Sequence, residues 1–322
     1  MRTAALTAVV LAAIAAPLFL IPIPFFIFGP GDAVDLNRVI AVPKHTPPAG
    51  TLYLTDVRLF PGRPAYYLAA RALPGFEIVP RSFVAAPNES DRSVNRRLVD
   101  AMRESQLTAQ VVAERAAGYP VRARYAFVVI RTAARSPGAR CFDVGDAIVK
   151  IDGRPPEHPD DIVRVTRSQP PGTLFHLVVE RGRAARDVAL TCRTARLGGR
   201  ARFGIVVETR TDSVDVPIRV SFDVPRINGS SAGLMFALQI YRTLTGTVFA
   251  GGAKIAGTGV LNFDGTVGAI EGAREKLQAA EREGASVFVL PAANSRDVRR
   301  VAGVKIVPVT SFAAALKALE VL

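Results

Sequence analysis

The chain has 322 residues, 49% of them hydrophobic, which is enough to fill two modest domains. Its formal net charge of +13 comes almost wholly from arginine, because lysine occurs at only six positions. The positive charges are scattered, with no run longer than Arg96-Arg97 or Arg299-Arg300, and the sequence contains no nucleic-acid-binding motif. We therefore interpret the charge as a solvated surface, with attraction to an acidic cell envelope as the alternative, and we expect no nucleic-acid partner.

The N-terminal segment is apolar, and no residue from Thr3 to Phe28 is charged. As a helix it would reach roughly 39 Å, which exceeds the ~30 Å hydrocarbon core of a bilayer. Prolines at its far end predict a helix over about residues 4–21 that then loosens: Pro17, Pro22 and Pro24. A cleaved signal peptide with its small-residue site at residues 13–15 is the alternative, although such apolar regions normally run ~7–15 residues.

We expect residues 1–30 to form a transmembrane anchor with its flank. Arg2 and the amino terminus favour the cytoplasmic side, so residues 31–322 are expected outside the membrane. The predicted location is therefore the cell membrane, with a single pass and the C-terminal domains extracytoplasmic.

Residues 31–118 form an N-terminal region without recognisable chemistry. Alternating apolar residues predict a strand over 51–60, and an apolar stripe predicts a helix over 95–117 that Gly118 ends. This region is either a separate cap or a part that packs on the C-terminal domain.

Residues 119–196 have the short predicted strands and turns that are typical of a small β-rich domain. A strand region at 121–130 precedes the segments SPGA (136–139), GDAI (145–148) and IDG (151–153), and a helix is predicted over 159–167. This order resembles bacterial PDZ domains, which add a peptide strand to a sheet edge beside a helix. The resemblance implies a peptide between the 121–130 strand and the 159–167 helix, and a spacer without a ligand is the alternative.

The two cysteines, Cys141 and Cys192, both fall in this predicted PDZ-like domain. A disulfide is permitted if the domain is extracytoplasmic, and two buried free thiols are the alternative.

Residues 197–322 alternate strands and helices, which predicts an α/β (α+β) domain. Strands are predicted at 203–208, 216–224, 254–262, 287–290 and 304–309, and helices at 232–244, 273–283 and 295–301, with a last helix capped by Ser311.

A serine lies where a small-residue turn meets a predicted helix, in the segment Asn228 to Gly233 (NGSSAG). This segment also fits Gly-x-Ser-x-Gly, the nucleophile turn of α/β-hydrolases. In that fold the catalytic histidine follows the serine, whereas all three histidines precede Ser231 here: His45, His158 and His176. The hydrolase triad is therefore excluded by chain order.

Lys276 is a candidate base for this serine. Ala273, Leu277 and Ala280 define the inward face of its predicted helix, and Lys276 falls about 60° from the centre of that face. There its ammonium would be partly desolvated. Taken alone, such a lysine is more often a flanking residue that snorkels to water.

Together these residues resemble the proteolytic domain of Lon-type serine proteases, which use a Ser/Lys dyad. The turn Asn228 to Gly233 matches Asp-Gly-Pro-Ser-Ala-Gly, and residues 271–280 match Gly-Gly-x-x-x-Lys-x-x-Ala-Ala. Thr-Gly at 258–259 and Pro-x-x-Asn at 291–294 also match. With the PDZ-like domain and the anchor, the whole chain resembles the membrane-anchored, Lon-like PDZ proteases of bacteria.

The resemblance implies Ser231 as the nucleophile, Lys276 as the general base and Thr258 as a group that orients the amine. Gly229 belongs to the supporting turn, as do two departures from the cytosolic enzymes: Asn228 replaces an aspartate and Ser230 replaces a proline. The loss of that negative charge would either lower the lysine pKa further or leave the turn less well held. A free lysine has a pKa of ~10.4, so action at neutral pH requires a fall of roughly three units.

No Walker A motif occurs in the sequence. We therefore expect an ATP-independent serine endopeptidase that cleaves unfolded or extended segments, with peptide recruited by the PDZ-like domain and with no cofactor or metal. The resemblance implies that the chain can form a homo-oligomer, although the sequence does not identify an interface. The alternative is a catalytically degenerate, membrane-anchored peptide-binding scaffold. A Ser/Lys amidase or penicillin-binding enzyme would require Ser-x-x-Lys, which is absent.

Overall fold

The computed structural model describes residues 16–73, 75–158, 160–182, 186–224 and 227–322. They form two compact units. One, the discontinuous unit, comprises the chain up to Tyr119 together with Ile218–Leu322, and the other, the inserted unit, comprises Pro120–Pro217. The N-terminal region that was predicted at 31–118 thus belongs to the same unit as the C-terminal domain.

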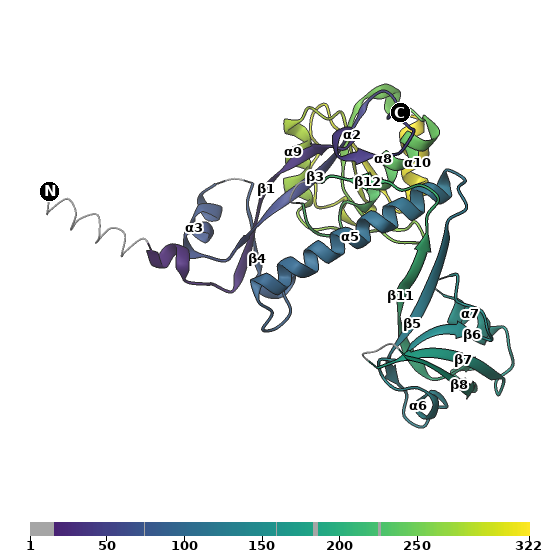
Figure 1. Cartoon of the computed structure of the whole chain (residues 1–322). Helices are drawn as coiled ribbons and strands as arrows, with labels where there is room; N and C mark the ends of the chain where they lie inside the picture. Colours follow the sequence, from purple (N-terminus) through teal and green to yellow (C-terminus); the bar gives the residue numbers. More distant parts are fainter. Residues whose placement is uncertain (1–15, 74, 159, 183–185, 225–226) are drawn as a thin grey trace, which may run out of the picture. The chain divides into compact units, whose positions relative to one another are not determined.

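The discontinuous unit is built on a six-stranded sheet with the order β17-β16-β13-β3-β1-β4 (Figure 1). Its strands are β1 (Phe25–Asp35), β3 (Thr51–Pro61), β4 (Glu77–Pro80), β13 (Lys254–Gly257), β16 (Val287–Pro291) and β17 (Lys305–Val309). The four strands from β3 to β17 pair in parallel, whereas β1 runs antiparallel to both β3 and β4. Residues 25–30, predicted as part of the anchor segment, are therefore a sheet strand whose Phe26, Ile27 and Phe28 are buried.

Helices cover both faces of this sheet. Strand side chains alternate between faces, and Leu52 and Leu54 of β3 join the core around helix α8 (Gly233–Thr245), whereas Tyr53 joins the core around helix α9 (Ala273–Arg282). The long helix α5 (Asp91–Ala116) packs against α8, and the Ser90 hydroxyl caps it by accepting the N–H of Ser93. The last helix, α10 (Phe312–Glu320), is capped by Ser311, as predicted.

Short elements complete the discontinuous unit. They are α2 (Leu36–Val39), β2 (Ile40–Ala41), α3 (Pro64–Ala72), α4 (Arg81–Val84), β12 (Ser221–Phe222), β14 (Val260–Leu261), β15 (Val267–Gly268) and the 3-10 turns η1 (Ala250–Gly252) and η2 (Ala292–Asn294). The predicted helix at 295–301 was wrong. A turn at residues 295–297 follows η2 instead, and the Asn294 side chain bonds to Ile270 and to Asp297 there.

The predicted membrane span covers residues 4–21, and its residues 4–15 lie outside the described part of the chain. Within the rest of the span, residues 16–20 are helical. Among the residues that the structure describes, none belongs to a helix with both the length and the apolar character needed to cross a bilayer.

The inserted unit is a five-stranded antiparallel sheet with the order β11-β5-β6-β7-β8. Its elements are β5 (Arg122–Thr132), α6 (Gly138–Cys141), β6 (Ala147–Ile151), α7 (Asp161–Arg167), β7 (Leu174–Arg181), β8 (Arg186–Arg193), β9 (Ala195–Leu197), β10 (Arg200–Arg202) and β11 (Ile205–Asp215). Cys141 and Cys192 form a disulfide, so the alternative of two free thiols was wrong.

Two sequence expectations about this unit require correction. The predicted boundary at 196/197 falls too early, because β11 pairs with β5 over its whole length and thus belongs to the inserted unit. The predicted peptide groove beside the 121–130 strand is also wrong. That strand is β5, which is paired on both sides, and the edge strand is β11.

Candidate active site

The turn that carries Ser231 is held by helix α5, which lies in the region where the sequence shows no recognisable chemistry. Gly229 has a φ of 102°, a conformation that favours glycine, and its N–H donates to the Leu98 carbonyl at 2.8 Å. The Ser105 hydroxyl donates to the Ser230 carbonyl at 3.1 Å. The 95–117 pattern predicted the helix, but no local signal in the sequence indicated that it anchors this turn.

The backbone of Ser231 is also fixed from the sheet side. Its carbonyl accepts the Gly259 N–H at 2.7 Å and the Thr258 hydroxyl at 3.1 Å. Thr258 was predicted to orient the lysine amine. Its buried hydroxyl instead donates to the nucleophile's own carbonyl, because Thr258 directly follows β13 and lies beside the Ser231 turn.

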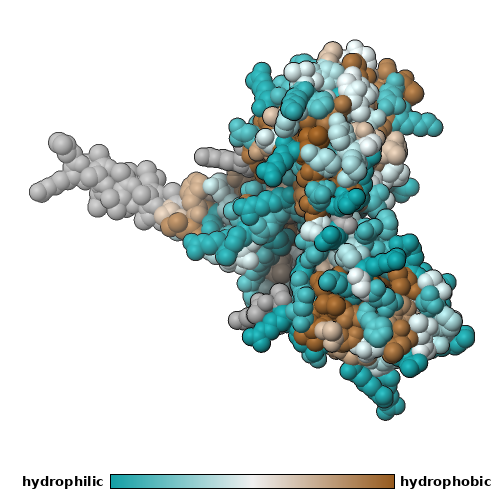
Figure 2. Space-filling model, turned by 45° about the vertical axis from the view of Figure 1, so that its right-hand side comes forward, coloured by the Kyte–Doolittle hydropathy of each residue, from teal (hydrophilic) through white to brown (hydrophobic). Residues whose placement is uncertain are grey.

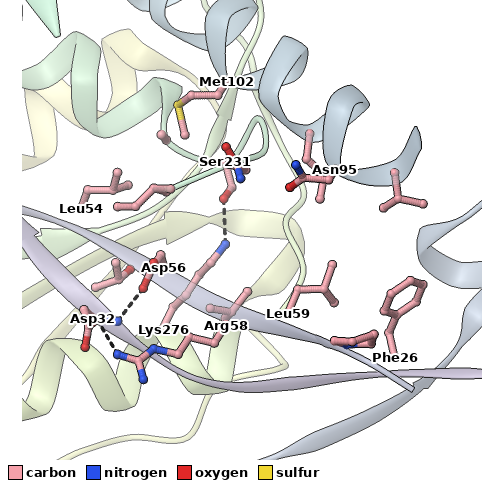
Figure 3. A pocket seen from close by; sticks show the side chains of 18 of the residues that line it. Phe26, Asp32, Leu54, Asp56, Arg58, Leu59, Asn95, Met102, Ser231 and Lys276 are labelled. Atoms are coloured by element: carbon pink, nitrogen blue, oxygen red, sulfur yellow. Dashed lines mark hydrogen bonds and ion pairs between the residues drawn. The ribbon is translucent and has the colours of Figure 1, made fainter. Parts of the chain in front are cut away.

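Lys276 Nζ donates to Ser231 Oγ at 2.9 Å (Figure 3). The lysine lies in the first turn of α9, after Gly272, whose φ of 65° turns the chain into the helix. A Cβ at Gly272 would come within 2.6 Å of Val57 Cγ1, so β3 and α9 meet closely here. The structure therefore brings together the two predicted residues, which are 45 positions apart.

Lys276 is only 3% exposed, and burial lowers its pKa to about 8. Burial disfavours the ammonium, since it removes the water that solvates the charge. Three carboxylates oppose this effect: Glu271 before α9, Asp56 of β3 and Glu275 of α9. The fall from the ordinary value of 10.5 is slightly smaller than the three units expected from the sequence.

A cavity of about 620 Å³ opens at the serine and the lysine. Helix α5 lines it with residues spaced along one face: Asp91, Val94, Asn95, Leu98 and Met102. Strand β3 lines it with nearly every residue from Leu54 to Pro61. Because neighbouring strand side chains point to opposite faces, a cavity that touches consecutive residues must lie along the strand's backbone edge.

Beyond Leu54, this edge of β3 has no strand partner among the described residues. The parallel partner β13 ends at Gly257, opposite Leu54, and the Gly257 carbonyl accepts the Thr55 hydroxyl at 3.0 Å. Beyond this point the described pairing of β3 is with β1 alone, on the other side. An extended chain in the cavity would therefore find free backbone groups along residues 56–61.

Sequence reasoning missed the acidic residues of the cavity, among them Asp56 and Asp32. Asp56 accepts the Asp32 N–H, and Asp32 forms an ion pair with Arg58 at 2.8 Å (Figure 3). Burial raises the pKa of Asp56 and is the largest effect on it. The hydrogen bond from the Asp32 N–H is the second largest effect, and it lowers this pKa. These residues come from the N-terminal strands, which carry no motif, so only the tertiary structure places them beside Lys276.

The other predicted supporting residues lie around the turn. Asn228 is exposed and lines the cavity, and Ser230 is also exposed, so it is the hydroxyl of Ser231 that meets the lysine. Among the described residues, no acceptor is bonded to the N–H groups of Ser231 and Ala232 at the start of α8. No group of three His, Cys, Asp or Glu side chains suited to a metal occurs in the part of the chain that the structure describes.

Comparison with known proteins gives two family matches. The Lon protease (S16) C-terminal proteolytic domain matches residues 188–318, and the PDZ domain matches residues 128–181. The chain carries a Lon-type proteolytic domain and a PDZ domain. The Lon-type match identifies a peptidase domain, yet it omits residues 25–119, which supply three sheet strands and helix α5 to the same unit.

Individual relatives cover small parts of the chain. The Lon protease of Neorickettsia sennetsu is 32% identical over 109 residues, which is 32% of this chain and 13% of that protein. The archaeal Lon protease of Methanocaldococcus jannaschii is 34% identical over 98 residues, 30% of this chain and 15% of that protein. The PDZ domain of an SdrC-like protein from Listeria monocytogenes is 18% identical, covers 25% of this chain and 85% of that structure, and has a TM-score of 0.24.

Proposed function

We propose that the chain is an ATP-independent, membrane-tethered serine endopeptidase that cleaves unfolded or extended segments with a Ser231/Lys276 dyad. The observation that carries this proposal is the 2.9 Å hydrogen bond between Nζ and Oγ, made by a lysine that water hardly reaches. The absence of a Walker A motif from the sequence motivates ATP independence, and the uncharged residues from Thr3 to Pro24, before β1, motivate the tether.

In the proposed reaction, neutral Lys276 takes the Ser231 proton as Oγ attacks a peptide carbonyl carbon. The resulting ammonium then gives this proton to the leaving amine, and the C–N bond breaks to leave an acyl-enzyme. Water next attacks the ester, Lys276 takes a proton from the water, and that proton returns to Oγ when the ester bond breaks. The N–H groups of Ser231 and Ala232, which have no bonded acceptor among the described residues, are candidates to stabilise the oxyanion.

The depressed pKa is what makes this base usable. A fall from 10.5 to about 8 corresponds to about 3 kcal/mol of disfavoured ammonium. At pH 7 about 9% of such lysines are neutral, compared with less than about 0.1% for a free lysine.

The substrate form follows from the shape of the cavity. A peptide that adds to the unpaired edge of β3 must be extended, because sheet addition requires its backbone groups to be free. A folded helix or a paired strand does not offer those groups, so segments that are unfolded or loosely held are the expected substrates.

Peptide recruitment is proposed at the edge strand β11 of the inserted unit. Ile205 and Val207 of β11 pack in the same hydrophobic core as Ile162 and Val165 of α7, and α7 itself contacts β10, which comes just before β11 in the chain. A nearby cavity of about 290 Å³ is lined by Arg167, Arg196 and Arg200, among other residues, and suits a carboxylate.

Digestion of casein by the purified full chain tests the catalytic proposal. Ser231→Ala and Lys276→Ala are expected to abolish cleavage, whereas Ser295→Ala and Lys317→Ala, which change the same residue types at other sites, retain it. Undiminished cleavage by either dyad variant would end the dyad proposal. A serine-reactive acylating probe, located by mass spectrometry, should label Ser231 and not Ser230.

The departures at Asn228 and Ser230 favour a second candidate, a scaffold that binds peptides without cutting them. The wild-type chain would then leave casein and a peptide library intact while still retaining peptides. That result would exclude the peptidase.

A further inference from the structure

Helix α3 is exposed and has almost no polar residues. Its sequence is PAYYLAARA, in which Arg71 is the only charged residue and Ala70 is the only buried one. Tyr66 and Leu68 are 37% and 59% exposed. A helix on the surface of a water-soluble domain normally turns a polar face outward, and α3 has no such face.

The exposed apolar side chains continue from α3 onto its neighbours. Phe19 and Tyr66 stack edge to face with their ring centroids 6.3 Å apart. Half of the sixteen large hydrophobic residues that are exposed in the described chain lie in this part of the discontinuous unit. We call this set the apolar surface: Leu18, Phe19, Leu20, Ile21, Tyr66, Leu68, Leu73 and Phe83. In Figure 2 a small group of tan and brown residues borders the grey part of the molecule.

We propose that the apolar surface lies in the interfacial region of a lipid bilayer, with α3 parallel to the membrane plane. Apolar helices that carry aromatic and basic residues are suited to the boundary between headgroups and acyl chains. Arg71 is exposed and Arg63 is half-buried at the start of α3, so both can approach anionic headgroups.

The neighbouring sequence favours a bilayer over a protein partner. The apolar surface is continuous along the chain with the uncharged stretch that begins at Thr3. No residue between Thr3 and the start of β1 at Phe25 is charged. An exposed patch of this size requires a cover, and a membrane can cover the residues before β1 and the exposed side of α3 together.

This placement would bring the cavity close to the membrane, since the cavity lies along β3 and α3 follows that strand in the chain. The cavity lining ends at Pro61, and α3 begins at Pro64. Pro64 lies eight residue steps after Asp56, which is beside the dyad, and at about 3.3 Å per step the two are at most about 26 Å apart. If the proposed peptidase function holds, its preferred substrates are extended segments within this distance of the bilayer surface.

A single tryptophan can report the contact, because the natural chain contains none. We would place Leu68→Trp in the full chain and bind it to vesicles of phosphatidylcholine and phosphatidylglycerol, with or without brominated acyl chains. Val248→Trp, at a 44% exposed position outside the apolar surface, is the matched control. The Leu68→Trp emission should shift to shorter wavelength and be quenched by the brominated lipid, whereas the Val248→Trp emission should do neither.

Two results would overturn the proposal. One is a Leu68→Trp emission that stays unquenched although the protein floats with the vesicles. The other is a shift without vesicles that grows with protein concentration, since a second protein molecule would then cover the surface. Measuring the same variants with Ser231→Ala separates this question from the peptidase proposal, because the quenching needs no turnover.

Discussion

Raising the pH is the most direct perturbation of the Ser231–Lys276 pair. With a lysine pKa of about 8, the neutral fraction rises from about 9% at pH 7 to about 91% at pH 9. If the neutral amine is the base, kcat/KM for an unstructured fluorogenic peptide should rise about tenfold over this range. A profile that is flat between these two pH values would refute the assignment of the base.

The carboxylates around the lysine provide a sharper version of this test. Glu271 is the largest of the three effects that oppose the fall in the Lys276 pKa. Glu271→Gln removes its charge, so the lysine pKa should fall further and the pH profile should move to lower pH. A further fall of one unit would raise the neutral fraction at pH 7 about fivefold.

The control for this variant is Glu320→Gln, which makes the same change at an exposed position on α10. It should leave the profile where it is in the wild type. A shift of the Glu271→Gln profile to higher pH would show that the electrostatic reasoning has the wrong sign.

Three further predictions concern stability. The pKa of Lys276 is lower in the folded state than in the unfolded state, so the unfolded chain binds more protons between about pH 8 and 10.5, and the free energy of unfolding should rise with pH in that window. At pH 7 the buried ammonium destabilises the fold. Lys276→Met should therefore raise the free energy of unfolding at pH 7 by about 3 kcal/mol in urea titrations. Gly272→Ala should lower it by about 2 kcal/mol, since the positive φ and the contact with Val57 both disfavour a Cβ; unchanged stability would contradict the close meeting of β3 and α9. Reduction of the Cys141–Cys192 disulfide, which closes a loop of 51 residues, should destabilise the inserted unit by about 4 kcal/mol in denaturant titrations followed by circular dichroism, and equal midpoints with and without reductant would exclude this.

Thr258 shows what a sequence motif can specify and what it cannot. The Thr-Gly match correctly drew attention to a residue beside the dyad, but it could not say which atom the hydroxyl meets. That choice depends on where β13 ends relative to the Ser231 turn, and strand ends are set by pairing between distant segments.

The sequence by itself was sufficient for the local parts of the site. A small-residue turn before an apolar helix and an amphipathic helix with one inward lysine are patterns within short windows, and residue order and spacing determine them directly. The order of short segments in the PDZ domain could likewise be recognised in the sequence, because turns and hairpins depend on neighbouring residues.

Only the tertiary structure decided what surrounds the dyad. Strands β1 and β3 join the sheet of a domain whose helices lie about 200 residues later, and α5 supplies the contacts that hold the Ser231 turn. The membership of β11 was decided in the same way, by its pairing with β5. Both choices depend on which faces and edges can be buried together, and a strand's own residues do not specify its partner when that partner is far away in the chain.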